Sequence, residues 1–430
     1  MRLLLIGGTG FIGSALARAL SADGHDLRIL ARDIGHGRRM VPDADWRHGD
    51  LNMMTRPADW SAYLIGVEAV INASGLLQGG SGDTVQAIQS DAIIAMASAA
   101  QAAGVARIIQ ISAAGADANP TDFMTTKLIA DAALMHGPVP TLVLRPGLVI
   151  GRNAYGGTEL IRMAAAMPIR MTPRLGGSIH CIALDDVVDA VRIGLTQRQV
   201  PAHPVDLVGR EAHSLVAIID AHRRWLALPP SRWSLIIPPW LMAVVTFAAD
   251  LLGHLRWRSP LRSNAVAALE RGVDGDTAMT ADWLGREPLS LEQTLGRMAA
   301  GKQDRIAAAV NLLMPIALLA LIMMWGASGI ATLVHLQDAT SMIVAGGVDP
   351  MVARILAAGG ALVDLLLAVA LLWRPTARLA LLAMVAMTAT YLLLGSALLP
   401  QLWVDPLAPL AKALPPLVLA LILLPVMDKR

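Results

Sequence analysis

Four long apolar segments near the C-terminus constrain this chain more than any other feature. In a sequence of 430 residues they cover residues 307–331, 353–373, 379–399 and 407–427. Each is long enough to cross the hydrocarbon core of a bilayer as an α-helix, which takes about 20 apolar residues. One such segment also fits a buried helix of a soluble protein. Four in succession, separated by short polar or proline-containing turns, predict an all-α four-helix transmembrane bundle over residues 305–430.

The charged residues between these segments predict how the bundle is oriented. Basic residues precede the first segment, separate the second from the third and close the chain: Lys302, Arg305, Arg374, Arg378, Lys429 and Arg430. The alternate loops carry Asp338, Asp349 and Asp405, with Arg354 as the one basic exception. Because basic loops stay on the cytoplasmic side, we expect an integral protein of a bacterial-type inner membrane, with its N-terminal domain and C-terminus in the cytoplasm.

Two ionisable residues and a proline pair stand out within the predicted spans. Asp364 is near the centre of the second span, where a carboxylate costs about 2.5–3.5 kcal/mol to insert and normally faces the bundle interior. Its interpretations are a proton relay, a quinone contact, an ion pair with Lys412, or a hydrogen-bonded packing residue. Lys412 is close to the outer end of its span, where it can also snorkel to the interface. Pro415 and Pro416 are expected to distort the fourth helix.

The first 150 residues alternate short apolar strands with helical segments. Strands are expected at residues 3–6, 27–31, 67–73, 107–112 and 140–144, and helices at 11–22 and 91–103. This rhythm predicts an α/β fold with a Rossmann-type doubly wound parallel sheet. The apolar start of the chain breaks at Gly7 and Gly8, which is too early for the apolar region of a signal peptide. It is therefore interpreted as a buried strand that leads into a glycine turn.

The segment after the first strand is rich in glycine. Residues 7–13 read Gly-Gly-Thr-Gly-Phe-Ile-Gly, between a strand and the start of a helix. Gly7 would permit a tight turn, Gly10 would let the backbone approach a pyrophosphate, and Gly13 would allow close packing of helix and strand. The free N–H groups and the dipole of the helix N-terminus favour an anion. The loop predicts a dinucleotide site made of Gly7, Thr9, Gly10, Phe11, Ile12 and Gly13.

The end of the second strand bears on which dinucleotide binds. NAD-dependent enzymes usually place an acidic residue there to accept the ribose hydroxyls. This chain has Arg32 at that position, with Arg38 and Arg39 close behind, and a guanidinium suits a 2′-phosphate. NADP(H) is therefore favoured, while the neighbouring Asp33 leaves NAD(H) open. Asp50 and Leu51, after the next short strand, are candidates to contact adenine.

Six segments carry a resemblance to a known superfamily. They are residues 7–13, 49–51, 70–75, 111–116, 144–147 and 179–188. In their order and sequence they resemble the atypical and extended short-chain dehydrogenases/reductases, close to the NAD(P)H-binding, epimerase-like branch that includes the NADPH-binding accessory subunit of mitochondrial complex I. The resemblance covers roughly the first 230 residues and brings Ala73 into the expected cofactor site. The tail is similar to the DoxX-like membrane families by its span count and arrangement.

The same resemblance exposes a departure at the catalytic position. Active members of the superfamily use a Tyr-x-x-x-Lys pair and a nearby Ser or Thr. The matching residues here are Phe123 and Lys127, so the proton-donating tyrosine is replaced. The serine position falls on alanines directly after Ser112. Lys127 and Ser112 are the catalytic candidates that remain, with Lys127 also expected to hold the cofactor ribose. Thr125 and Thr126 are alternatives with more ordinary structural roles.

Other reactive side chains give weaker signals. His180 could act as an acid in the substrate half, but a hydrogen-bonded sheet histidine is the commoner role. The single cysteine, Cys181, excludes an intramolecular disulfide and reads as a small buried side chain. No Cys/His cluster has metal-ligand spacing and no Ser-His-Asp arrangement is visible, so no metal is expected. The net charge of +2 gives no basic field for nucleic acid.

These observations lead to a domain plan and two competing functions. Residues 1–235 are expected to form the NAD(P)-binding domain with its substrate-side elements, 236–304 an amphipathic linker region, and 305–430 the membrane domain. The first hypothesis is an oxidoreductase on a lipophilic substrate such as a quinone or isoprenoid. The rival, favoured by Phe123, is a non-catalytic module in which bound NADPH stabilises or regulates the membrane part. Redox-controlled transport rests on Asp364 alone.

Overall fold

The structure is a computed structural model of the whole chain. It describes residues 1–76, 79, 84–115, 121–154, 156–173, 176–257, 259, 261–263, 266, 272–406 and 408–427. The chain divides into two compact units. The sheet unit comprises Met1–Leu251 and Ser259–Ala308, and the helical unit comprises Leu252–Arg258 and Ala309–Arg430. The sequence-predicted boundaries at 235 and 304 stay predictions.

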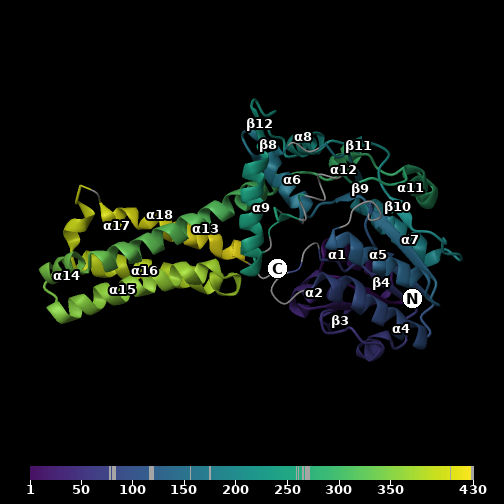
Figure 1. Cartoon of the computed structure of the whole chain (residues 1–430), viewed down its shortest axis with the longest axis horizontal. Coiled ribbons are helices and arrows are strands. Elements are labelled where there is room, and N and C mark those ends of the chain that lie inside the picture. The colour runs from purple at the N-terminus through teal and green to yellow at the C-terminus, as the bar shows by residue number, and fades with distance from the viewer. Residues whose placement is uncertain are drawn as a thin grey trace. The chain divides into compact units, whose positions relative to one another are not determined.

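A seven-stranded parallel sheet is the centre of the sheet unit (Figure 1). Its strand order is β10-β6-β5-β4-β1-β2-β3, with every neighbouring pair parallel. The strands are β1 (Arg2–Ile6), β2 (Asp26–Ala31), β3 (Asp45–His48), β4 (Ala69–Asn72), β5 (Arg107–Ile111), β6 (Thr141–Pro146) and β10 (Val205–Leu207). The chain turns outward in both directions from β1 and β4, which is the doubly wound arrangement that the sequence predicts.

The side chains of β1 are buried on both faces of this sheet, which explains why helices cover both. Leu3 and Leu5 belong to one apolar cluster, which also holds buried residues of α1 (Phe11–Ala22) and α7 (Leu184–Thr196). Leu4 and Ile6 belong to a second cluster, with residues of α4 (Ala92–Ala102) and α5 (Asp122–Met135). Because successive side chains of a strand point to opposite faces, a continuous apolar strand requires a helical layer on each side.

The rest of the sheet unit forms a smaller lobe around a third cluster, which includes Ile150, Ile179 and Ile218. Its strands form a three-stranded and a two-stranded sheet: β7 (Leu148–Ile150), β9 (Ile179–Ala183) and β11 (Ala212–His213), and β8 (Arg170–Pro173) with β12 (Ser234–Ile237). Its helices are α6 (Gly157–Ala166), α8 (Leu215–Trp225), α9 (Pro239–His254) and α12 (Leu291–Arg297). By contrast, α11 (Thr277–Leu284) packs on the main sheet, where Leu284 joins the first cluster. Shorter elements of the sheet unit are α2 (Ile34–Met40), α3 (Ser61–Leu64), η1 (Pro57–Trp60) and η2 (Ala87–Asp91).

The helical unit contains long apolar helices that pack along one another (Figure 1). They are α13 (Lys302–Val334), α15 (Pro350–Leu372), α16 (Arg374–Leu398) and α18 (Leu414–Leu423), with short α14 (Leu336–Ala345), α17 (Pro409–Lys412), η4 (Pro400–Trp403) and η5 (Leu424–Met427). The fourth apolar helix breaks at Ala413, where α17 ends and α18 begins with Pro415 in its first turn. Proline lacks the N–H that a continuous helix needs, so the predicted distortion is confirmed.

Small residues let two of these helices approach closely. A Cβ on Gly329 of α13 would lie 2.7 Å from the carbonyl oxygen of Ala361 in α15. In a bilayer the hydrophobic effect does not favour helix association, because lipid tails are as apolar as the side chains. Close packing at small residues stabilises the association instead. Large apolar side chains such as Leu319, Val369 and Leu393 are exposed on the outside of this packing. The four span-length helices cover Lys302–Val334, Pro350–Leu372, Arg374–Leu398 and Pro409–Met427, which confirms the predicted four-helix arrangement.

Candidate nucleotide site

The glycine loop lies where the sheet changes its winding direction. β1 pairs with β2 on one side and β4 on the other, so the carboxyl ends of β1 and β4 meet at the switch point. Ligands of open α/β sheets bind in the crevice at this position. The loop after β1 leads directly into α1, whose N-cap Gly10 offers no side-chain cap and whose first turn has no acidic residue. The first N–H groups of α1 are therefore suited to a phosphate.

Contacts within the protein require two of the three motif glycines, Gly7 and Gly13. Gly7 has φ +78°, and a Cβ there would lie 2.9 Å from the carbonyl oxygen of Ala73. A Cβ on Gly13 would lie 2.1 Å from the carbonyl oxygen of Gly7. At Gly10 a Cβ would meet, among the described residues, only that same oxygen at 3.1 Å. The space in front of Gly10 is thus open, as approach of a pyrophosphate to the backbone requires.

At the end of β2, the two charged residues have different surroundings. Arg32 follows the last strand residue and is exposed. Asp33 is the N-cap of α2, and its carboxylate accepts the His36 N–H at 2.9 Å. This hydrogen bond, with a smaller contribution from the nearby charge of Arg39, lowers the pKa of Asp33. The acid that kept NAD(H) open is therefore occupied with capping a helix.

The other residues expected near the cofactor follow the neighbouring strands. Asp50 holds its loop by accepting the backbone N–H of Asn52 at 3.1 Å, and Leu51 packs on the second apolar cluster. Ala73 directly follows β4, and its N–H donates to the Ile6 carbonyl at 3.0 Å. Phe11 and Ile12 begin α1 and pack against the first cluster. Their side chains serve the core, so a role at the cofactor would fall to their backbone N–H groups.

Lys127 of α5 is buried beneath this crevice. Only 3% of its surface is exposed, and its Nζ donates to the carbonyl oxygens of Ser74 at 3.0 Å and Ile111 at 2.8 Å. Burial lowers the pKa of Lys127 to about 8, against the opposing effect of the nearby Asp131 carboxylate. An ammonium group has three donors. Two hold the ends of β4 and β5, which leaves one for a ribose hydroxyl.

Asp131, one helical turn beyond Lys127, interacts electrostatically with this amine. Ser112 Oγ donates to Asp131 Oδ2 at 2.5 Å, and Arg145 Nε lies 3.6 Å from the same oxygen. Burial raises the pKa of Asp131, opposed by the Ser112 hydroxyl and the charges of Lys127 and Arg145. Because the Ser112 proton is donated to Asp131, Ser112 is placed to position the network rather than to polarise a substrate carbonyl.

The structure also shows the surroundings of Thr125 and Thr126, the predicted alternatives to the missing tyrosine. Thr126 is buried, accepts from Gln89 Nε2 at 3.0 Å and donates to the Asp122 carbonyl of its own helix. Thr125 is exposed on α5, and Phe123 is half-buried one turn before Lys127. Of the segment 111–116 in the predicted motif, Ala116 lies outside the described residues. Asn72 and Gln110, joined at 2.8 Å beneath the loop, are polar core residues that sequence reasoning missed.

His180 and Cys181 lie in β9, away from the glycine loop in sequence and sheet. His180 is 8% exposed; its Nδ1 lies 2.7 Å from the Gly209 carbonyl oxygen and its Nε2 3.4 Å from Asp274. Burial raises the pKa of the Cys181 thiol to about 12, so it is not a reactive thiolate. Across the part of the chain that the structure describes, no three His, Cys, Asp or Glu side chains are grouped to hold a metal ion.

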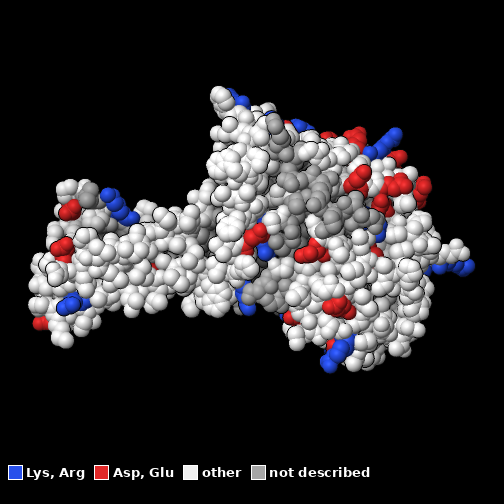
Figure 2. All heavy atoms as spheres, in the orientation of Figure 1, with Lys and Arg blue, Asp and Glu red and all other residues white. Residues whose placement is uncertain are grey.

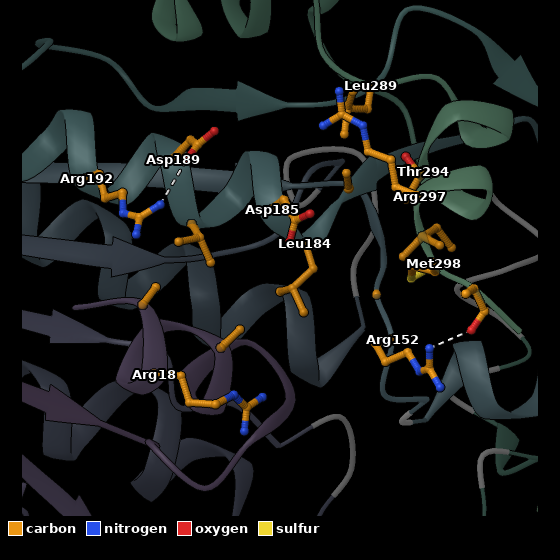
Figure 3. Close-up of a pocket in the computed structure, with 17 residues that line it drawn as sticks. Arg18, Arg152, Leu184, Asp185, Asp189, Arg192, Leu289, Thr294, Arg297 and Met298 are labelled. Carbon is orange, nitrogen blue, oxygen red and sulfur yellow. Dashed lines mark hydrogen bonds and ion pairs between the residues drawn. The ribbon is translucent and has the colours of Figure 1, made fainter. Parts of the chain in front are cut away.

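A cavity of about 700 Å³ beside α1 had no counterpart in the sequence motifs (Figure 3). Four arginines line it, together with Asp185 and Asp189 of α7: Arg18, Arg152, Arg192 and Arg297. Arg192 pairs with Asp23 and Asp189, and Arg152 donates to the Ala299 carbonyl. The lining comes from four distant segments, so no local pattern could reveal it. It flanks the middle of α1, not the glycine loop at its start.

In the helical unit, Asp364 is 4% exposed and bonded to two other helices. Its Oδ2 accepts Ser328 Oγ of α13 at 2.8 Å, and its Oδ1 accepts the Tyr391 hydroxyl of α16 at 2.9 Å. The hydrogen-bonded interpretation of Asp364 fits this arrangement. No ion pair joins Asp364 to Lys412 among the described residues. Lys429 and Arg430, used to predict orientation, lie outside the described residues.

Two family descriptions match separate parts of the chain. Residues 7–154 match the family described as NAD(P)H-binding, and residues 307–421 match the DoxX-like family. The first match covers the glycine loop, Arg32 and Lys127, and the second covers nearly all of the helical unit beyond the first turns of α13. Both agree with the resemblances seen in the sequence.

Two curated relatives match a stretch of the chain. An uncharacterized chloroplastic protein of Arabidopsis thaliana is 27% identical over 169 residues, which are 37% of this chain and 54% of the relative. A ceramide reductase of Caulobacter vibrioides is also 27% identical over 169 residues, 38% of this chain and 51% of the relative. The chain thus spans about half the length of the curated relatives it matches.

Solved structures confirm the fold of the sheet unit. UDP-glucose 4-epimerase of Thermotoga maritima matches with a TM-score of 0.52 at 14% identity, over 70% of this chain and 97% of the epimerase. The Bordetella bronchiseptica enzyme WbmG, solved with NAD, matches with a TM-score of 0.53 at 18% identity, over 69% and 92%. The chain therefore joins an NAD(P)H-binding Rossmann domain of epimerase-like fold to a C-terminal DoxX-like domain with four long apolar helices.

Proposed function

We propose that this protein is a membrane-anchored oxidoreductase that uses NADP(H) to reduce a carbonyl group on a lipophilic substrate. The observation that carries the proposal is the buried Lys127 amine beneath an open glycine loop, in the same chain as four span-length apolar helices. A hydride donor bound there would be tethered to the membrane in which a lipophilic substrate dissolves. Candidate substrates are quinones, isoprenoids and keto-lipids. The last class is suggested by the relative named as a ceramide reductase.

The preference for NADP(H) over NAD(H) is supported by the end of β2. Arg32 occupies the position where an acid would accept the ribose hydroxyls, and Asp33 caps α2 instead. A guanidinium provides a fork of donors that suits a 2′-phosphate. WbmG, a fold neighbour, was solved with NAD. The preference therefore depends on Arg32 itself and is tested by changing that residue.

Bound nicotinamide supplies the hydride, and the chain must hold the reacting groups and provide a proton. Lys127 has a third donor for the ribose and a pKa of about 8, close enough to neutral for proton exchange at the crevice. Phe123 cannot give a proton to a substrate oxygen. We therefore assign Lys127 to cofactor positioning and proton supply through the ribose hydroxyl or water, and Ser112 to positioning through Asp131.

The test uses the full chain purified in mild detergent. The co-purifying nucleotide is identified first, and the absorbance of NADPH is then followed with a short-chain quinone, an isoprenoid aldehyde and a keto-sphingolipid. We expect NADPH oxidation that requires one of these acceptors and is lost in Lys127→Met. Bound NADPH without turnover on any acceptor would contradict the enzyme proposal.

The second candidate function is favoured by Phe123. A protein that keeps the cofactor lysine but lacks the tyrosine hydroxyl could bind NADPH without catalysis. Binding would then stabilise or regulate the membrane domain. That function predicts NADPH binding with no turnover, together with changed hydrogen exchange in α13, α15 and α16 on binding. Unchanged exchange there would exclude it.

The cytoplasmic orientation is part of the proposal, because cellular NADPH must reach the loop. It is supported by Lys302, Arg305, Arg374 and Arg378 at the ends of the spans. In spheroplasts, a cysteine placed at the exposed Ile65 should resist a membrane-impermeant maleimide until the cells are opened. Labelling of this cysteine in intact spheroplasts would contradict the cytoplasmic orientation.

A further inference from the structure

An exposed apolar surface lies on α9 and the neighbouring strand β12. On α9, the exposed large side chains are Trp240, Val244, Phe247 and Leu251, at spacings of four, three and four residues. These spacings place all four on one face of a helix. Ala249, half a turn away, is buried. On β12 and just before it, Trp233, Leu235 and Ile236 are also exposed.

The aromatic side chains of this surface are highly exposed. Phe247 is 70% exposed, Trp233 71% and Trp240 68%, and these aromatic rings follow one another along β12 and α9. Soluble proteins rarely expose contiguous apolar patches of this kind unless something covers them. Figure 2 shows the surface over α9 as mostly free of charged atoms. The sequence predicts an amphipathic linker over 236–304 but does not say what its apolar face contacts.

The charges around the surface fit a lipid interface. From residue 238 to 257 the only acidic residue is Asp250, and Arg262 Nε pairs with it at 3.2 Å. Arg232 and Arg256 are exposed at the two ends of the surface. A helix with aromatic and aliphatic residues on one face and arginines at its borders lies in the plane of an anionic bilayer surface. Trp is enriched at that depth because its ring is apolar and its N–H is polar.

The tryptophans of this surface differ in their hydrogen bonds from the buried and half-buried tryptophans of the sheet unit. Trp46, Trp60 and Trp225 each donate the indole N–H to a backbone carbonyl. Among the described residues, neither Trp233 nor Trp240 has such a partner. Their indole N–H groups are therefore available to lipid headgroups or interfacial water while the rings enter the acyl boundary.

The residues that follow α9 are attached to the membrane helices, which indicates that a bilayer covers the apolar surface. α9 ends at His254, and Leu252–Arg258 belongs to the helical unit. Within that unit the Leu255 carbonyl accepts the N–H of Arg374, the first residue of α16, at 3.1 Å. Trp257 Nε1 donates to the Leu372 carbonyl at the end of α15, and the Arg374 guanidinium lies 5.3 Å from the Trp257 ring centroid. The residue directly after α9 is thus fixed at the end of two membrane spans.

We infer that α9 and β12 form a monotopic membrane-contact surface, with Trp240, Val244, Phe247 and Leu251 inserted into the headgroup–acyl boundary. This inference does not depend on the proposed catalytic activity. Because the spans hold the chain in the membrane in any case, the experiment must measure local depth and not membrane binding. Insertion of a helix face by about 5–10 Å is what such surfaces show.

The experiment uses the full chain in vesicles of phosphatidylethanolamine and phosphatidylglycerol. A nitroxide spin label is placed on Phe247→Cys and, as a matched control, on Ile65→Cys, because the native side chains are 70% and 68% exposed. The native Cys181 is buried and its pKa is raised to about 12, so the unmodified chain serves as the labelling blank. The ratio of collisions with oxygen to collisions with a water-soluble nickel chelate reports depth in lipid.

We expect this ratio to be several-fold higher at position 247 than at position 65, and a label on Val244→Cys to behave like 247. Adding Trp240→Glu should lower the ratio at 244 without changing the helix content of the protein, since Trp240 is outside the core. Equal ratios at 247 and 65 would overturn the inference.

A second copy of the chain is the other occupant to test. If position 247 is shielded from both oxygen and nickel chelate, and two labels approach one another only when two copies share a nanodisc, the surface is a protein interface and the inference fails. If the exposure of position 247 to oxygen is the same with one copy per nanodisc as with two, the result supports lipid contact.

Discussion

The two units each bury one aspartate among hydroxyl groups, and they differ in the charges that surround it. Asp131 of the sheet unit is 2% exposed and accepts Ser112 Oγ, with the cations Lys127 and Arg145 close by. Asp364 of the helical unit is 4% exposed and accepts two hydroxyls, from Ser328 and Tyr391. No cationic group contributes to its surroundings among the described residues.

This difference indicates that the Asp131 network is a charged site, whereas the Asp364 network is a packing contact between helices. Around Asp131, a buried carboxylate and a buried amine compensate one another beneath the crevice where a phosphate-bearing cofactor is expected. Around Asp364 of α15, two neutral hydroxyl donors from α13 and α16 converge in an apolar bundle, so the carboxyl group joins three helices through hydrogen bonds. The comparison predicts that substitutions in the two networks have very different costs.

Asp131→Asn is expected to have the largest effect. It removes the carboxylate that compensates Lys127 and Arg145, and breaking one partner of a buried ion pair costs about 3–5 kcal/mol. Hydrogen exchange of peptides from α5 and β5 would measure this as a loss of local unfolding free energy. Asp122→Asn, on the exposed side of the same helix, is the control. Equal exchange in the two variants would mean that Asp131 is not part of a charged network.

Lys127→Met tests the cofactor end of that network. A hydrogen bond from a charged donor contributes about 1.5–3 kcal/mol, so NADPH affinity should fall by about tenfold to a hundredfold. Lys302→Met removes an exposed lysine and should leave the affinity unchanged. Fluorescence titration of the full chain in detergent measures both.

The pH dependence of binding follows from the same amine. The charged form of Lys127 is the better donor, and its pKa is about 8. NADPH affinity should therefore be constant at pH values well below 8 and fall as the pH rises through that value. Lys127→Met should remove this decline. A decline that persists in the variant would assign the titration to another group.

Arg32→Asp should change the choice of cofactor more than the strength of binding. The substitution removes the donor for a 2′-phosphate and supplies an acceptor for ribose hydroxyls. We expect the ratio of NADPH to NADH affinity to fall by about tenfold or more, the scale of one charged hydrogen bond. Arg18→Asp, on the exposed surface of α1, is the control for charge alone.

Tyr391→Phe is expected to have the smallest effect. It removes one hydrogen bond to Asp364 while keeping the ring that stacks on Trp325. Hydrogen bonds between membrane helices average about 0.6 kcal/mol and reach about 1.7. Thermal unfolding of the bundle in detergent should shift only slightly. A loss as large as that of Asp131→Asn would contradict the assignment of Asp364 to a packing contact between helices.

Local rules predicted much of the fold and the glycine loop. The turn at Gly7 and the packing of Gly13 depend on residues within a few positions, and β1, α1 and β5 lie close to where the sequence predicts them. The four spans follow from composition alone. Asp33 shows the limit, because an aspartate beside a strand can serve a ribose or cap a helix, and the helix cap became visible only with the start of α2.

Long-range pairs could not be predicted. Ser112 was a catalytic candidate because of its strand-end position, yet its partner Asp131 comes from a helix that the sequence did not connect to it. The addition of β10 to the sheet beside β6 brings together residues about 60 positions apart. Likewise, the exposed face of α9 became meaningful only when the burial of its opposite side was known.

The most direct test of the account is a calorimetric titration of the purified full chain in nanodiscs with NADPH and then with NADH. The account predicts one site per chain, tighter binding of NADPH than NADH, and reversal of this order in Arg32→Asp. Absence of binding by either nucleotide, to a protein whose sheet unit is folded by hydrogen exchange, would contradict the claim that the glycine loop at Gly7 is a dinucleotide site.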